Sequence, residues 1–178
     1  NKLVENGIKN LFLSNESHII SPVVSIDQDA SVKYIRSHKK SATHSAVYYA
    51  KLTNRIGISI VPYGTDLFHS ISAIKYAKDK CIPLIVLSSN IKNKTFIENI
   101  TEDFAPITKW SYDIPCVDAI PDVIDEAFRY SQFKNAGPIY LNISKSIISS
   151  RFENNGKRFR FDHEYEPPNI EKKVILNM

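Results

Sequence analysis

A continuous apolar run, Pro83-Leu84-Ile85-Val86-Leu87, constrains the fold of this chain more than any other feature. A short run with no polar interruption predicts a strand that is buried on both faces. Such strands belong to parallel sheets, in which the helices that connect the strands cover both sides of the sheet. The remaining sequence is therefore expected to supply further strands separated by helices.

The segments on either side of this run show that alternation. Right-handed connections between parallel strands then give an α/β fold, a doubly wound parallel sheet with helices on both faces. Residues 1–150 are expected to form this domain, and the polar residues 151–178 resemble a linker that leads to missing domains. Strands are predicted over 8–13, 32–36, 58–61 and 139–143, and helices over 39–53, over 66–77 with Asp66 as the N-cap, and over 118–133.

The composition excludes several classes of protein. A chain of 178 residues that is 43% hydrophobic and 24% charged is an ordinary domain rather than a disordered chain or a disulfide scaffold. No run of 18 apolar residues is present, so no transmembrane helix and no membrane partner are expected. The nearest approach to a basic stripe, Lys157-Arg158-Phe159-Arg160-Phe161, is followed at once by acidic residues, and it predicts an amphipathic segment rather than a nucleic-acid or phosphate site.

The cysteine and glycine residues exclude or disfavour further classes of site. Cys81 and Cys116 form no Cys-x-x-Cys pattern, so we expect reduced, buried thiols in a cytoplasmic protein. The sequence contains five glycines and neither a Gly-x-Gly-x-x-Gly nor a Walker A motif, which disfavours a nucleotide-binding domain. In a doubly wound sheet, ligands bind at the carboxyl ends of the strands. The candidate loops are therefore residues 14–18, 37–40, 62–69 and 88–96.

Seven short motifs occur in the order found in one known family of domains. The first contains Gly7-Ile8-Lys9-Asn10-Leu11-Phe12, and the last contains Ala136-Gly137-Pro138-Ile139. With this order and spacing, residues 3–150 resemble the N-terminal, pyrimidine-binding domain of thiamine-diphosphate enzymes of the acetolactate synthase and pyruvate oxidase type. The other matching segments are 38–44, 48–51, the stretch from Gly57 to Pro83 with its helix, and Thr108-Lys109-Trp110-Ser111.

The resemblance implies that this chain is the pyrimidine side of an acetolactate-synthase-like 2-keto acid carboligase or decarboxylase. The family holds its cofactor, thiamine diphosphate with Mg²⁺, between two domains, and the second domain carries a Gly-Asp-Gly signature that is absent here. The implied partner is a diphosphate-binding domain of the same or another chain, without which this chain would be inactive. A homo-oligomer with an inter-chain active site is also expected, in contact through small residues of the helices over 39–53 and 66–77, namely Ala42, Ala46, Ala50 and Ala73.

The positions that match the family's cofactor site differ from the family pattern. A family glutamate that hydrogen-bonds N1′ of the aminopyrimidine is matched by Lys39, and an ammonium group only donates where a carboxylate accepts. The family's Gly-Pro-Gly loop reads Gly64-Thr65-Asp66, and an asparagine that contacts the pyrimidine is replaced by His69. The candidate cofactor-binding residues are Ser14, Asn15, Gly64, Thr65, His69 and Phe96, with Lys39 at the catalytic position and no metal ligand.

Lys39 leaves three interpretations open. It is a surface lysine without a role, a changed residue that faces a working pyrimidine pocket, or a group that acts in catalysis by another route. Glu16 or Glu98 could supply the missing carboxylate, although each is first a solvated loop acid. His38 and His44, six residues apart, predict packing or hydrogen bonding rather than a shared metal.

Two functions therefore remain. The first is an enzyme domain, and the second is a catalytically silenced homologous domain that serves as a binding or oligomerisation module. The replacement of the pyrimidine-activating glutamate by Lys39 favours the second.

Overall fold

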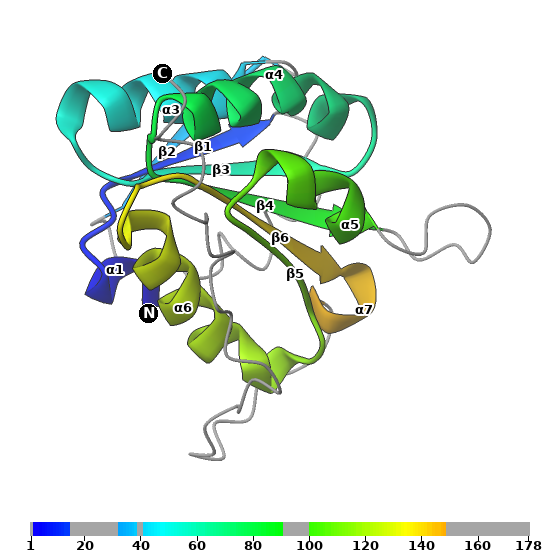
Figure 1. Ribbon diagram of the computed structural model, residues 1–178. Coiled ribbons are helices and arrows are strands. Elements are labelled where there is room, and N and C mark those ends of the chain that lie inside the picture. The colour runs from blue at the N-terminus through cyan, green and yellow to red at the C-terminus, as the bar shows by residue number, and fades with distance from the viewer. Residues whose placement is uncertain (1, 15–31, 39–40, 91–99, 149–178) are drawn as a thin grey trace, which may run out of the picture.

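The computed structural model describes residues 2–14, 32–38, 41–90 and 100–148 (Figure 1). At their centre lies a six-stranded sheet with the strand order β2-β1-β3-β4-β6-β5. Every pair of neighbouring strands is parallel. The strands are β1 (Asn10–Ser14), β2 (Lys33–Ser37), β3 (Gly57–Pro62), β4 (Leu84–Asn90), β5 (Trp110–Ile114) and β6 (Pro138–Ser144).

Helices cover both faces of this sheet, as Figure 1 shows. On one face, α3 (Ala42–Thr53), α4 (Thr65–Asp79) and α5 (Ile100–Phe104) contribute to one apolar core. On the other face, α1 (Lys2–Glu5) and α6 (Ile120–Gln132) pack over a second core. The predicted doubly wound parallel sheet is confirmed. The remaining elements are the 3₁₀ turns η1 (Ala105–Ile107) and η2 (Val117–Ala119) and the short helix α7 (Lys145–Ile148).

The apolar run of β4 lies in the middle of the sheet, as expected. Leu84 and Val86 face the core beneath α3 and α4, whereas Ile85 and Leu87 face the core beneath α6. All four side chains are buried. Because successive side chains of a strand point to opposite faces, a strand covered on both sides is apolar at every position.

The sequence did not predict β5 as a strand or α5 as a helix. Trp110 opens β5 and is buried in the core beneath α6, where its ring lies 5.3 Å from the ring of Tyr130. β5 pairs with β6 rather than with β4, although β4 precedes it in the chain. β5 is buried on one face only, with Trp110 and Ile114 in the core and Asp113 exposed, so its sequence lacked the apolar run that marked β4.

Two predictions about single residues are wrong. Asp66 is not the N-cap of α4, because the helix begins at Thr65 and Gly64 takes the N-cap position. Cys81 and Cys116 are free but exposed rather than buried. Cys81 lies in the tight turn between α4 and β4 with a φ of 51°, and turns of this kind run over the surface of a domain.

The small residues proposed for self-association are also not on the surface. Ala42, Ala46 and Ala50 of α3 and Ala73 of α4 are at most 3% exposed and belong to the core. Their small side chains let these helices approach the sheet and each other within the chain. The exposed apolar side chains of the two helices are instead Tyr48, Leu52, Phe68 and Ile71.

Candidate functional site

The carboxyl ends of β1 and β3 bring together the described residues of the predicted site. Ser14 is the last residue of β1, and Gly64, Thr65 and His69 follow β3 at the start of α4. Because β1 and β3 are neighbours in the sheet, these residues lie at the same edge. The other predicted residues, Asn15, Glu16, Lys39, Phe96 and Glu98, lie outside the described residues, and their roles stay predictions.

Ser14 and Asp66 form a buried pair at this edge. The Ser14 hydroxyl donates a hydrogen bond to Oδ2 of Asp66, and the two residues are 0% and 4% exposed. A buried carboxylate requires a donor, and the first turn of a helix favours its negative charge. The bond therefore ties the end of β1 to the beginning of α4, 52 residues further along the chain.

Buried hydroxyl groups extend this pair toward the middle of the sheet. Ser70 of α4 donates to the backbone oxygen of Asp66 at 2.9 Å. The hydroxyl of Thr43 on α3 lies 2.8 Å from that of Ser70 and 3.2 Å from that of Ser59 on β3. These contacts hold α3, β3 and α4 in a common arrangement behind the site. Sequence reasoning missed them, because the hydroxyl groups that meet here are 16 and 27 residues apart in the chain.

Gly64 leaves open space at the start of α4. Its backbone has a φ of 116° and a ψ of −145°, a conformation that glycine alone adopts at low cost. A Cβ atom placed on Gly64 would find no other atom within 4 Å. Thr65 is exposed and His69 is half-buried in the adjoining turns. An open backbone flanked by a hydroxyl and an imidazole can receive the edge of a flat polar ring.

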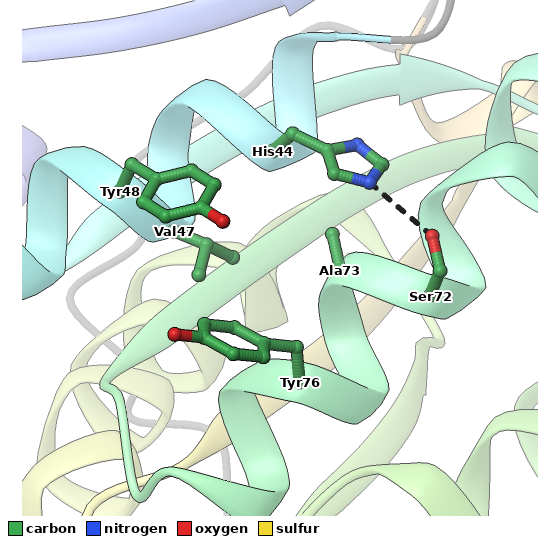
Figure 2. Close-up of a pocket in the computed structure, with 6 residues that line it drawn as sticks. All are labelled: His44, Val47, Tyr48, Ser72, Ala73 and Tyr76. Atoms are coloured by element: carbon green, nitrogen blue, oxygen red, sulfur yellow. Dashed lines mark hydrogen bonds between the residues drawn. The ribbon is translucent and has the colours of Figure 1, made fainter.

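A second hollow lies between α3 and α4 on their outer side (Figure 2). It is a shallow groove of about 190 Å³, lined by six residues of these two helices. His44 Nε2 lies 3.2 Å from the Ser72 hydroxyl, so His44 is hydrogen-bonded as predicted. Lys51 donates to the Tyr76 hydroxyl at 2.7 Å, and this bond raises the pKa of Lys51. The groove brings together none of the predicted cofactor residues.

Among the described residues, no group of three or more His, Cys, Asp or Glu side chains could hold a metal ion. The same part of the chain contains no helix whose length and apolar character would allow it to cross a membrane.

Several known proteins are similar to this chain. Residues 1–104 match the family described as "Thiamine pyrophosphate enzyme, N-terminal TPP binding domain". The acetolactate synthase large subunit of Lactococcus lactis is 29% identical over 116 residues, which cover 62% of this chain and 20% of that protein. That of Buchnera aphidicola from Schizaphis graminum is 24% identical over 153 residues, which cover 82% of this chain and 27% of the relative.

Human 2-hydroxyacyl-CoA lyase 1 is also similar, with 25% identity over 139 residues, or 74% of this chain and 24% of that protein. Among solved structures, a candidate thiamin diphosphate-dependent enzyme from Mycobacterium smegmatis has a TM-score of 0.71 at 18% identity. The match covers 80% of this chain and 29% of that one, and it shows the shared fold. This chain thus spans about a fifth to a quarter of the length of these curated relatives.

Proposed function

The chain belongs to the family of thiamine pyrophosphate enzyme N-terminal TPP binding domains, and on this premise we propose that it supplies the pyrimidine side of an acetolactate-synthase-like active site. The observation that carries the proposal is the open edge at Gly64, next to the end of β1. In a doubly wound sheet this is the edge at which ligands bind. The diphosphate side, with its Mg²⁺, would come from a second domain of the same or another chain, and a homo-oligomer would place the site between chains.

The described residues at this edge fit the aminopyrimidine ring of thiamine diphosphate. Gly64 presents backbone without a side chain in the way, and the Thr65 hydroxyl and His69 imidazole can donate to the ring nitrogens or accept from the amino group of the ring. The Ser14 hydroxyl is already engaged by Asp66, so its contribution would be to hold the end of β1 in place. When bound, the cofactor supplies an acidic thiazolium C2–H group.

Lys39 sets the limit on activity in this proposal. An ammonium group at the position of the family glutamate donates hydrogen bonds and accepts none. A lysine that is not desolvated carries a positive charge near neutral pH, and a cation beside a ring nitrogen opposes protonation of that nitrogen. We therefore propose that the chain binds and orients the pyrimidine ring but assists proton removal weakly.

Hydrogen–deuterium exchange at C2 of bound cofactor tests this proposal in the complete protein. Lys39→Glu should raise the exchange rate by about 10²- to 10⁴-fold, the range of a general acid–base group. Lys40→Glu makes the same charge change one residue away and should leave the rate unchanged. If the wild-type protein already exchanges as fast as a relative with the glutamate, Lys39 is not at the pyrimidine, and Glu16 and Glu98 become the residues to test.

A silenced binding or oligomerisation module is the second candidate function. The observation in its favour is the outer face of α3 and α4, where Tyr48, Leu52 and Phe68 are each at least half exposed. Leu52→Glu with Phe68→Glu should weaken any self-association measured by sedimentation. Phe133→Glu, an exposed aromatic after α6, is the matched control. Absence of cofactor binding by the complete protein, together with self-association through this face, would favour the module over the enzyme domain.

A cytoplasmic location is part of the proposal. Cys81 and Cys116 are free and exposed, and free surface thiols are typical of a reducing compartment. Labelling of both thiols by a maleimide in intact cells, without prior reduction, is the expected result. Thiols that react only after reduction would contradict this location.

A further inference from the structure

A second group of polar side chains lies toward the carboxyl ends of β4, β5 and β6, apart from the candidate site. Ser88 of β4 is paired with Asn142 of β6, and Asn142 is paired with Asp113 of β5. The three residues thus form one row across the sheet. Tyr140 precedes Asn142 by two positions and therefore points to the same face.

The orientation of the Asn142 amide follows from its partner. Its Nδ2 donates to Oδ1 of Asp113 at 2.5 Å, and Thr101 donates to Oδ2 of the same carboxylate at 2.8 Å. A carboxylate accepts and does not donate, so the nitrogen of the amide must face Asp113. The Asn142 carbonyl oxygen is therefore directed away from this acid.

Three buried polar atoms of this group lack a hydrogen bond in the described part of the chain: Ser88 Oγ, Tyr140 OH and Asn142 Oδ1. Ser88 and Tyr140 are fully buried, and Asn142 is 6% exposed. The Tyr140 ring is held by Phe104, which stacks on it at a centroid distance of 4.3 Å and an interplanar angle of 18°. Buried polar atoms without partners are rare in native proteins, so each of these requires an explanation.

The Tyr140 and Ser88 hydroxyls are neighbours. Burial raises the pKa of the Tyr140 phenol, and the Ser88 hydroxyl opposes that rise, as a hydrogen-bonding neighbour would. The two groups nevertheless do not meet the distance and angle of a direct hydrogen bond. Two hydroxyls that are close but poorly aligned can both bond to a third polar group beside them.

We propose that Ser88, Tyr140 and Asn142 bind a single internal water molecule. The site offers two hydroxyl donors and one carbonyl acceptor, and water can accept two hydrogen bonds while it donates another to the carbonyl. An ammonium ion cannot accept from either hydroxyl. The water joins β4 to β6 by side-chain contacts, in addition to their backbone pairing, at the edge of the sheet where ligands of this fold bind.

A crystal structure of the chain at better than about 2 Å resolution tests this site. The expected result is one fully occupied water within about 2.6–3.2 Å of all three atoms, the usual range of hydrogen bonds. A direct bond between the two hydroxyls with no density between them would overturn the proposal. So would a peak with oxygen distances near about 2.4 Å, which marks a metal cation, or protein density that fills the position.

Counting long-lived waters by oxygen-17 relaxation dispersion gives an independent measurement in solution. The double variant Ser88→Ala with Tyr140→Phe removes both donors and should hold one long-lived water fewer than the wild type. Thr43→Ala with Ser70→Ala, which removes two buried hydroxyls that are already bonded to each other, should leave the count unchanged. An equal count in the wild type and in a folded Ser88→Ala, Tyr140→Phe variant would contradict the proposal.

Discussion

Gly57 permits the close contact between α3 and the sheet. A Cβ atom at this position would lie 2.8 Å from the backbone carbonyl carbon of Ala46 and 3.3 Å from the Cβ of Ala50. The nearest atoms belong to helix backbone, which cannot rotate away as a flexible side chain can. Gly57 was predicted only as one end of a matching segment, and its reason for being glycine emerges from the packing of α3.

Gly57→Ala should therefore destabilise the chain by about 1–3 kcal/mol, the usual cost of adding a methyl group to a packed core. Urea unfolding followed by fluorescence of Trp110, the only tryptophan, measures the change. Asn135→Ala changes an exposed residue and serves as the control. A Gly57→Ala variant as stable as the wild type would show that α3 can move away from β3 at little cost.

Because of Tyr140, the stability of the folded chain should depend on pH in the alkaline range. Burial raises the pKa of its phenol in the folded chain above the reference value of 10.0. The folded state thus keeps its proton where the unfolded state loses it, so the stabilisation is complete below about pH 10 and is lost as the pH rises above that value.

The free energy of unfolding of the wild type should fall above about pH 10, relative to Tyr140→Phe, by up to about 1.4 kcal/mol per pH unit. Urea unfolding at several values between about pH 9 and 11 gives the slopes. Tyr48→Phe, which removes a half-exposed phenol, is the matched control variant. Identical slopes for the wild type and Tyr140→Phe would mean that the phenol ionises as readily folded as unfolded.

The end of α6 depends on a lysine from outside the helix. Lys109 precedes β5, and its ammonium group donates to the backbone oxygens of Tyr130 and Phe133 at 2.7 Å each. The last carbonyl groups of a helix have no partner within it, and the negative end of the helix dipole favours a cation there. Partial burial lowers the pKa of Lys109.

Lys109→Met should lower the free energy of unfolding by about 1.5–3 kcal/mol. The variant loses two hydrogen bonds from a charged donor, and the carbonyl oxygens of Tyr130 and Phe133 lose this partner. Lys75→Met removes an exposed ion pair to Asp79 and should cost at most about 1 kcal/mol. Thermal unfolding followed by circular dichroism compares the two variants. Equal effects would indicate that water replaces Lys109 at the helix end without loss.

The residues at the candidate site predict whether this chain binds thiamine diphosphate by itself. The described edge offers contacts to one ring only, and the sequence carries no Gly-Asp-Gly signature for a diphosphate with Mg²⁺. Calorimetric titration of this chain alone with thiamine diphosphate and Mg²⁺ should therefore show no measurable binding. The complete protein is the comparison, and micromolar binding by the isolated chain would contradict the proposed division of the site between two domains.

Much of the architecture was predictable from local patterns. The apolar run from Leu84 to Leu87 predicted a strand buried on both faces, and the apolar spacing over 118–133 predicted the helix α6. The order of the motifs predicted the family that residues 1–104 confirm. Residue spacing along one segment decides such features, because helix and strand periods bring side chains to a common face without help from distant segments.

Other features depended on contacts between segments that are far apart in the chain. The Ser14–Asp66 pair, the burial of Ala46 against Gly57 and the insertion of β6 between β4 and β5 have no local signature. For this reason Asp66 was mistaken for a helix cap and Cys81 for a buried thiol. The sequence by itself determined the central strands and the long helices, since periodicity and backbone preference mark them, whereas β5 and α5 carried no such local signal. Only the tertiary structure decided which polar groups are buried together, because burial depends on what packs on top of each side chain.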